Sequence, residues 1–280
     1  MLAQFIAPFL LSAAAHTLYI QERDSAGNLS KVSSKQLILA PQATIGKAGF
    51  SPGGISNPSL ALSNTDVPYL AFQDAPLNGS KAIVMRFNGT GWENVGTGAI
   101  SPGGAGDISM VISSTGVPYV AFSDATQGDK AAVMRFFGGK WEFLGAEGFT
   151  PGGAYFISLA LGTSDLPYIA YRDNANGNRL GIRKFDGTNW IDVGGPGSTG
   201  AVNSPSIAIN SAGIPYVAFQ DGAAGNKASV IRLSGNFWQN VGAAGFSSGA
   251  SLFTSLALNK SNVPYVSYQD AGNGSKAHGR

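Results

Sequence analysis

The sequence repeats itself with a period of about 49 residues, and this period is the strongest constraint on the fold. An aliphatic residue followed by Pro-Tyr occurs five times, at Pro68, Pro118, Pro167, Pro215 and Pro264. The four tryptophans, Trp92, Trp141, Trp190 and Trp238, are spaced by 49, 49 and 48 residues. A fixed period in this range indicates a repeat architecture, in which each repeat is one supersecondary unit.

Each repeat contains four short segments with the pattern of β-strands. They are rich in Val, Ile, Phe and Tyr and are bounded by Gly, Asn, Asp or Ser, which is typical of strands joined by hairpin turns. Proline opens the second segment, where a missing N–H is tolerated. The third segment is apolar on both faces, with Ala82 and Val84 on one and Ile83 and Met85 on the other. This predicts a sheet that lies between two other sheets.

Four antiparallel strands in a repeat of this length predict the blade of a β-propeller. The pattern SLAL, then VPYVAFxD, then GxKAxVMRFxG, then WxxVG resembles blades of bacterial secreted or surface propeller proteins and is distantly kelch-like. The resemblance covers nearly the whole chain and implies architecture only. We therefore predict an all-β, single-domain propeller over residues 1–280. Its six repeats span approximately 1–47, 48–97, 98–146, 147–195, 196–243 and 244–280, the first diverged and the last incomplete.

The ends of the chain leave the number of blades open at five or six. Residues 1–47 align with the second repeat at an offset of 50, and the sixth repeat stops within its third strand. Either six blades form with the last one incomplete, or residues 30–47 complete the blade that residues 252–276 begin. Closure removes the edge strands of a propeller. A third alternative is that the open half-blade pairs with a second copy of the chain.

Composition excludes several functional classes. The net charge of +2 argues against a nucleic-acid partner. The chain has no cysteine, so disulfides, thiol nucleophiles and cysteine-zinc sites are absent, and we expect no metal or other cofactor. Residues 2–15 are either a secretory signal or the first strand of a blade, and they are too short to span a membrane. We expect a secreted or cell-surface protein.

An aspartate ends the second strand of every repeat. These residues are Asp24, Asp74, Asp124, Asp173, Asp221 and Asp270, and a lysine or arginine follows each one six or seven residues later. We interpret the set as a structural ring of turns closed by ion pairs across the hairpin. The alternative is a ring of acids that binds a cation or a polyhydroxylated ligand.

Two other residue types recur once per repeat. One is a strand-three arginine, assigned to Arg86, Arg135, Arg183 and Arg232, which we expect to serve packing. The other is the tryptophan set, Trp92, Trp141, Trp190 and Trp238. A tryptophan face can stack on a sugar ring, so these four are the candidate ligand-binding residues. The alternative is that each tryptophan fixes its strand to the adjacent blade.

Catalytic motifs are lacking. The two histidines, His16 and His278, lie near the termini, and no metalloprotease, P-loop or dinucleotide-binding motif occurs. We therefore predict a non-enzymatic scaffold that binds a glycan or a protein at several equivalent sites. The alternative is an assembly unit that pairs into homo-oligomers through its incomplete blade. A carbohydrate-active enzyme is the third hypothesis, and it requires one blade whose residues at the central channel depart from the others.

Overall fold

The computed structural model describes residues 15–20, 33–38, 45–74 and 79–279. It separates the chain into two compact units, residues 1–48 and residues 49–280. Each unit is described by itself. The single-domain assignment of the six repeats stays a prediction.

The first unit contains one antiparallel hairpin, formed by β1 (Ala15–Ile20) and β2 (Ser33–Ile38). It pairs Tyr19 with Ser34. The second repeat pairs Tyr69 with Arg86, so an offset of 50 predicts that Tyr19 pairs with Gln36 instead. The hairpin register thus differs from that of the repeat by two residues. Asp24 lies outside the described residues.

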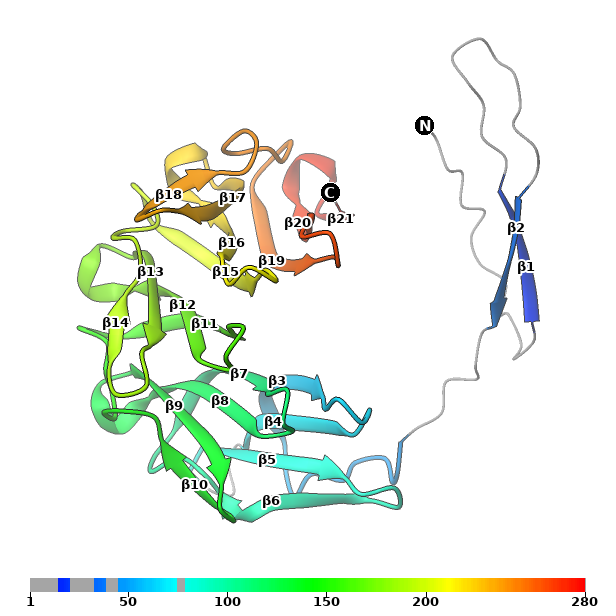
Figure 1. Cartoon of the computed structure of the whole chain (residues 1–280), viewed down its shortest axis with the longest axis vertical. Helices are drawn as coiled ribbons and strands as arrows, with labels where there is room; N and C mark the ends of the chain where they lie inside the picture. The colour runs from blue at the N-terminus through cyan, green and yellow to red at the C-terminus, as the bar shows by residue number, and fades with distance from the viewer. Residues whose placement is uncertain (1–14, 21–32, 39–44, 75–78, 280) are drawn as a thin grey trace. The chain divides into compact units, whose positions relative to one another are not determined.

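The second unit consists of five antiparallel blades (Figure 1), as the repeat pattern predicts. Four have four strands and the last has three. Blade 1 is β3 (Ile55–Leu62), β4 (Pro68–Asp74), β5 (Lys81–Phe87) and β6 (Trp92–Ala99); blade 2 is β7 (Ala105–Ile112), β8 (Pro118–Asp124), β9 (Lys130–Phe137) and β10 (Lys140–Phe143). Blade 3 is β11 (Ala154–Leu161), β12 (Pro167–Asp173), β13 (Arg179–Phe185) and β14 (Trp190–Asp192). Blade 4 is β15 (Val202–Ile209), β16 (Pro215–Asp221), β17 (Lys227–Ser234) and β18 (Phe237–Asn240), and blade 5 is β19 (Ser251–Leu258), β20 (Pro264–Asp270) and β21 (Lys276–Gly279). The prediction of an all-β propeller built from such blades is confirmed.

A single 3-10 turn joins the second strand to the third in blades 2 to 5. In blade 2 the carboxylate of Asp124 accepts a hydrogen bond from the Thr126 N–H at 2.9 Å, and Gly128 ends the turn with φ of 68°. Glycine adopts this left-handed conformation without the strain that a side chain adds. These turns are the longest helical segments that the structure describes, and none has the length and apolar character of a membrane-spanning helix.

The first strands of successive blades lie against one another and are joined by serine side chains. The hydroxyl oxygens of Ser59, Ser109, Ser158 and Ser206 each accept a backbone N–H of the next blade's first strand, at 2.9 to 3.1 Å. The first strands are therefore the inner strands of the unit, and the fourth strands are the outer ones.

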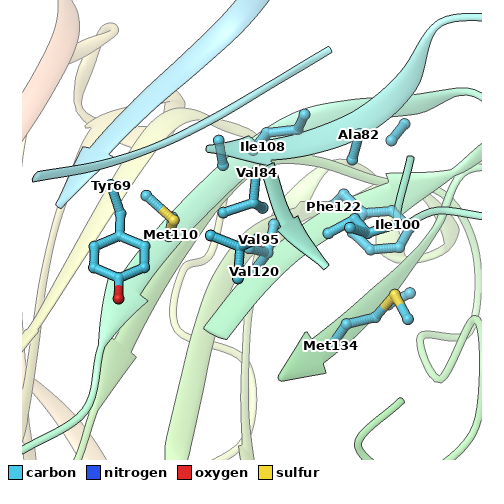
Figure 2. Packing of buried hydrophobic residues seen from close by; sticks show 13 residues of the cluster. Tyr69, Ala82, Val84, Val95, Ile100, Ile108, Met110, Val120, Phe122 and Met134 are labelled. Carbon is cyan, nitrogen blue, oxygen red and sulfur yellow. The ribbon is translucent and has the colours of Figure 1, made fainter. Parts of the chain in front are cut away.

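The core consists of apolar layers between blades. Between blades 1 and 2, Val84, Met110 and Phe122 pack together, and each of them is at most 4% exposed (Figure 2). Ile83 and Met85 are buried on the opposite face of β5. The prediction that the third strand is buried on both faces is therefore confirmed.

The first and last blades of this unit each expose an apolar face. Leu60 in β3 is 64% exposed, whereas its equivalent in blade 2, Met110, is 4% exposed. Tyr265 in β20 is 55% exposed, whereas Tyr216 in blade 4 is 6% exposed. A neighbouring blade covers these positions in the middle blades, and within the second unit nothing covers them at its two ends.

We expect the layers between blades to dominate stability. Phe122→Ala removes a fully buried ring and should lower the free energy of unfolding by about 3–5 kcal/mol. Phe237→Ala, on a side chain that is 75% exposed in β18, should change it by less than about 0.5 kcal/mol. Urea denaturation followed by tryptophan fluorescence measures both values. Equal losses would contradict the assignment of the core.

Candidate functional site

Every inner strand contains a β-bulge near its first residues. The register of β7 against β8, for example, shifts between Gly106 and Ser109. The bulge places one non-glycine residue at positive φ in each blade, namely Asn57 (50°), Asp107 (48°), Phe156 (53°), Ser204 (47°) and Phe253 (54°). Bulges that re-aim a side chain are common next to active sites. The bulged end of the inner strands is therefore the first place to look for function.

The repeats diverge at this end. The five bulge positions hold four different residue types, with phenylalanine in blades 3 and 5, although the serine two positions later recurs as Ser59, Ser109, Ser158, Ser206 and Ser255. The preceding cross-strand pair differs as well: Ser56 and Gln73, Gly106 and Ser123, Tyr155 and Arg172, Asn203 and Gln220, Leu252 and Gln269. Packing between blades keeps the residues in the rest of each blade similar, whereas the residues at these positions vary from blade to blade.

Blade 2 supplies two carboxylates here. Asp107 lies at the bulge of β7, and Asp129 lies in the loop between β8 and β9; both are half-buried. Burial raises the pKa of Asp107 above its ordinary value, and the negative charge of Asp129 acts in the same direction. The N–H of Phe156 and the charge of Arg172 oppose this shift. Asp107 therefore holds its proton to a higher pH than an exposed aspartate does.

Blade 3 supplies a cation and two aromatic rings. The guanidinium of Arg172 lies 4.8 Å from the ring centroid of Phe156 and 5.3 Å from that of Tyr155. Its Nη1 donates to the side-chain carbonyl oxygen of Asn203 in blade 4 at 2.8 Å. Its Nε is buried and has no hydrogen-bond partner among the described residues. Such a buried donor is costly to leave unpaired.

Hydrogen bonds join these residues across the blades. The Tyr155 hydroxyl donates to the Asp129 carboxylate at 3.4 Å. The side-chain amide of Asn203 donates to the side-chain carbonyl oxygen of Gln220 at 2.6 Å. The Gln220 amide donates in turn to the backbone carbonyl of Ser251 in blade 5. We use the name three-blade cluster for Asp107, Asp129, Tyr155, Phe156, Arg172 and Asn203.

The three-blade cluster combines a proton donor, a second carboxylate, a fixed cation and aromatic faces. Carboxylates with different surroundings serve as general acid and base in glycoside hydrolysis, and aromatic faces pack against the C–H face of a sugar. Within the described ranges no three His, Cys, Asp or Glu side chains are grouped as a metal site requires. The chemistry supported by the cluster is acid–base chemistry.

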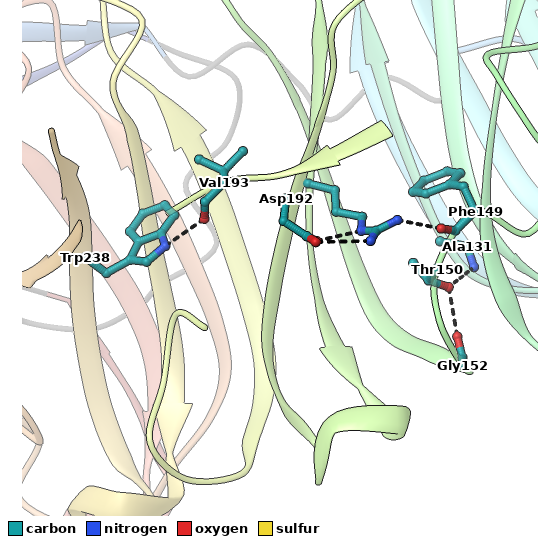
Figure 3. A network of polar contacts seen from close by, with 8 residues as sticks. Ala131, Phe149, Thr150, Gly152, Asp192, Val193 and Trp238 are labelled. Atoms are coloured by element: carbon teal, nitrogen blue, oxygen red, sulfur yellow. Dashed lines mark hydrogen bonds and ion pairs between the residues drawn. The ribbon is translucent and has the colours of Figure 1, made fainter. Parts of the chain in front are cut away.

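Three of the four tryptophans lie between blades. The indole N–H groups of Trp141, Trp190 and Trp238 donate to the backbone carbonyls of Val95, Leu144 and Val193 in the preceding blade, at 2.7, 2.7 and 3.0 Å. Figure 3 shows the Trp238 bond. Trp92 stacks on Phe50, with 4.5 Å between ring centroids. Trp190 is buried and the other three are half-buried. Ligand binding by these residues stays a prediction.

The aspartates that end the second strands are buried. Asp74, Asp124, Asp173, Asp221 and Asp270 are at most 8% exposed. Asp124, Asp173, Asp221 and Asp270 each accept the N–H of the residue two positions later. Within the described residues these four form no ion pair with the cation opposite them, since the ion pairs there are Arg86–Glu93, Arg135–Glu142 and Arg183–Asp192. The turn and the hydrogen bonds to it, rather than cross-hairpin ion pairs, account for the burial of these carboxylates.

Arg183 does not belong to the recurring arginine set. Tyr69, Tyr119 and Tyr216 pair across the strands with Arg86, Arg135 and Arg232, but the equivalent Tyr168 pairs with Lys184. Arg183 stands one position earlier, where the other blades have Met85, Met134 and Ile231. Adjacent strand residues point to opposite faces, so Arg183 has different neighbours from the other three arginines.

The sequence analysis missed Asp107, Asp129 and Arg172. None of the three recurs in the other repeats, so a search for recurring residues does not find them. The signal that could have found them is divergence between repeats, because the aligned repeats agree nearly everywhere and differ where the inner strand begins.

Comparison with known proteins shows the fold alone. No protein-family model matches the sequence, and no curated protein matches it. Among solved structures, a protein of unknown function from Dyadobacter fermentans has a TM-score of 0.53 at 15% identity, with 76% of this chain and 74% of that chain covered. A Hadza microbial sialidase has a TM-score of 0.52 at 13% identity, with 86% of this chain and 59% of that chain covered. A thermostable family-43 glycoside hydrolase reaches only 0.47 at 13% identity, with 79% and 86% covered.

The prediction of a non-enzymatic scaffold is corrected by these comparisons. The solved structures that resemble this chain include an enzyme, the sialidase. The enzyme hypothesis required one blade whose residues at the central channel depart from the others, whereas the structure shows differences between several blades at the start of the inner strands.

The raised pKa of Asp107 predicts that the free energy of unfolding of the wild-type protein depends on pH. Because the folded state holds this proton more tightly than the unfolded state, wild-type stability falls as pH rises from the ordinary aspartate pKa of about 3.9 to the raised value. Asp107→Asn does not titrate. Its unfolding free energy, relative to that of the wild type, should therefore increase as pH rises through that window.

Asp186→Asn is the control of opposite sign. The N–H groups of Asn189 and Thr188 lower the pKa of Asp186, so its carboxylate stabilises the fold above the ordinary pKa and this stability is lost as pH falls. Relative to wild type, this variant should lose stability as pH rises. Urea denaturation across pH 3 to 8 measures both series, and parallel trends would refute the assignment for Asp107.

Proposed function

We propose that this protein is a glycoside hydrolase whose catalytic site is the three-blade cluster. The observation that carries the proposal is the meeting of Asp107 and Asp129 with Arg172 at the one end of the inner strands where the repeats diverge. The likeness to a microbial sialidase supports the same class of chemistry, since that protein cleaves glycosides on a similar fold.

Asp107 acts as the proton donor to the leaving-group oxygen. A general acid must be protonated at the working pH, and burial together with the charge of Asp129 raises the pKa of Asp107. The backbone N–H of Phe156 donates to the Asp107 carboxyl and orients it. After the proton leaves, that N–H and the charge of Arg172 stabilise the carboxylate.

Asp129 is the second carboxylate that glycoside cleavage requires. The Tyr155 hydroxyl, at 3.4 Å, orients it from the next blade. Arg172 is held by Asn203 and by two aromatic rings, so its charge is fixed before the substrate binds. A fixed cation beside the sugar stabilises charge at little reorganisation cost. Phe156, 39% exposed, offers a face to the sugar ring.

The glycan partner follows from this proposal, and we extend it to a secreted or cell-surface location. Pairing with a second copy is also proposed, through β21, whose four residues are all exposed. The distant kelch-like resemblance stays a prediction.

Hydrolysis of aryl glycosides tests the assignment. We expect the full chain to release 4-methylumbelliferone from at least one of the sialic acid, xylose and arabinofuranose glycosides. Asp107→Asn and Asp129→Asn should each lower kcat/KM by about 10²–10⁴-fold. Asp186→Asn, an exposed aspartate in the β13–β14 turn, should leave it unchanged.

The role of Asp107 as acid has a sharper test. A leaving group of low pKa needs little protonation, so Asp107→Asn should lose far less activity on a 2,4-dinitrophenyl glycoside than on an alkyl glycoside. Asp129→Asn should lose activity on both. Hydrolysis that survives both substitutions on every substrate, or no hydrolysis by the wild type across the panel, would reject the proposal.

A further inference from the structure

Blade 3 contains a pocket that the three-blade cluster does not use. Its volume is about 320 Å³, and it opens where the chain leaves β14. Tyr171, Asp173, Asn176 and Asp192 line it together with the apolar side chains of Leu180 and Ile182. Cavities of about 300–1,000 Å³ with apolar walls and a few polar groups are typical small-molecule sites. This one is at the small end, which suits a ligand of about one sugar ring.

The polar lining is confined to blade 3. At the position of Arg183 and Asp192, which pair across β13 and β14, the other blades have Met85 with Asn94, Met134 with Phe143, and Ile231 with Asn240. At the position of Tyr171, blades 1, 2 and 4 have Phe72, Phe122 and Phe219. Blade 5 also has a tyrosine at this position, Tyr268, so the ion pair of Arg183 and Asp192 is what sets blade 3 apart from blades 1, 2 and 4.

A glycine makes room for the hydroxyl. Tyr171 pairs across the sheet with Gly181, and a Cβ on Gly181 would lie 2.5 Å from the Tyr171 Cζ atom. The equivalent residues are Ile83, Ala132 and Ser229, each of which has a side chain and faces a phenylalanine. The exchange of phenylalanine for tyrosine thus comes with the deletion of the side chain that opposes it.

The guanidinium of Arg183 is engaged outside the pocket. Its Nε and Nη2 donate to the two oxygens of Asp192 at 2.8 and 3.3 Å, and Nη1 donates to the backbone carbonyl of Phe149 at 2.6 Å (Figure 3). The pocket lining is consequently rich in acceptors, with the carboxylates of Asp173 and Asp192 and the hydroxyl of Tyr171. Two carboxylates face one guanidinium, so the site repels an anion.

We infer that the blade-3 pocket binds a neutral, hydroxyl-rich ligand, a single sugar unit. The hydroxyls of the sugar donate to Asp173 and Asp192, and its C–H face packs on Pro151 and Pro196, the exposed apolar residues of the lining. Burial raises the pKa of Asp173, and hydroxyl donors replace part of the hydration that burial removes.

This site goes beyond the proposed activity and does not rest on it. Asp173 follows Arg172 in β12, so the two side chains point to opposite faces of the blade-3 sheet. Arg172 belongs to the three-blade cluster, and Asp173 belongs to the pocket. A chain without hydrolytic activity would still bind the sugar here.

Nuclear magnetic resonance on the ¹⁵N-labelled full chain tests the site. The probes are D-xylose, L-arabinose and D-galactose, each titrated separately. We expect the backbone amides of Ala175, Asn176, Gly181 and Gly195 to shift, with a Kd of about 1 mM for at least one sugar. Tyr171→Phe with Asp173→Asn should raise that Kd at least about tenfold.

The variants are chosen so that the fold survives. Phenylalanine is the residue that three other blades have at this position, and asparagine keeps the oxygen that accepts the Ala175 N–H at 3.1 Å. Tyr268→Phe, the equivalent change in blade 5, is the matched control and should leave the Kd unchanged. Asp107→Asn should also leave it unchanged.

Four results would overturn the inference. The first is no amide shift for any of the three sugars, and the second is a Kd that the double variant does not change. The third is a set of shifts confined to the three-blade cluster and abolished by Asp107→Asn. The fourth is binding of ethylammonium chloride at the pocket without binding of any sugar, which would make it a cation site.

Discussion

Each blade has apolar side chains on both faces of its sheet, and it can bury them only against the blade before it and the blade after it. In blade 2, Ala132 on one face of β9 packs in the layer shared with blade 1, and Val133 on the other face packs in the layer shared with blade 3; both are fully buried. Polar contacts follow the same rule, since the serine hydroxyls and the tryptophan N–H groups bond to the adjacent blade. The second unit is therefore held together by repeated nearest-neighbour interfaces.

This constraint also explains where function can lie. The residues that pack between blades must stay alike, because each interface has the same shape. The start of the inner strand, where the bulge places one side chain outside the regular pairing, carries little of that packing. Asp107 and Phe156 occupy equivalent bulges and differ completely in chemistry. The three-blade cluster arises because unlike residues of blades 2, 3 and 4 meet at this end.

Regularity misled the functional prediction for the same reason. The recurring aspartates and tryptophans have roles that every blade needs: Asp124 caps a turn, and Trp190 bonds to the preceding blade. In this chain, a residue that recurs in every repeat serves the structure of the blade. The exceptions mark the candidate sites: Asp107 at a bulge belongs to the three-blade cluster, and Gly181 opposite Tyr171 belongs to the blade-3 pocket.

The sequence by itself determined the all-β class, the strand order within each blade, the turns and the burial of both faces of the third strand. Those features depend on local pattern and on a period that is visible without coordinates. The meeting of Asp107 with Arg172, 65 residues apart, and the pairing of Arg183 with Asp192 were decided by the tertiary structure alone. The physical reason is that a bulge shifts the strand register and twisted sheets set the angle between blades. Which side chains converge therefore depends on geometry that accumulates over several strands, and no single repeat contains it.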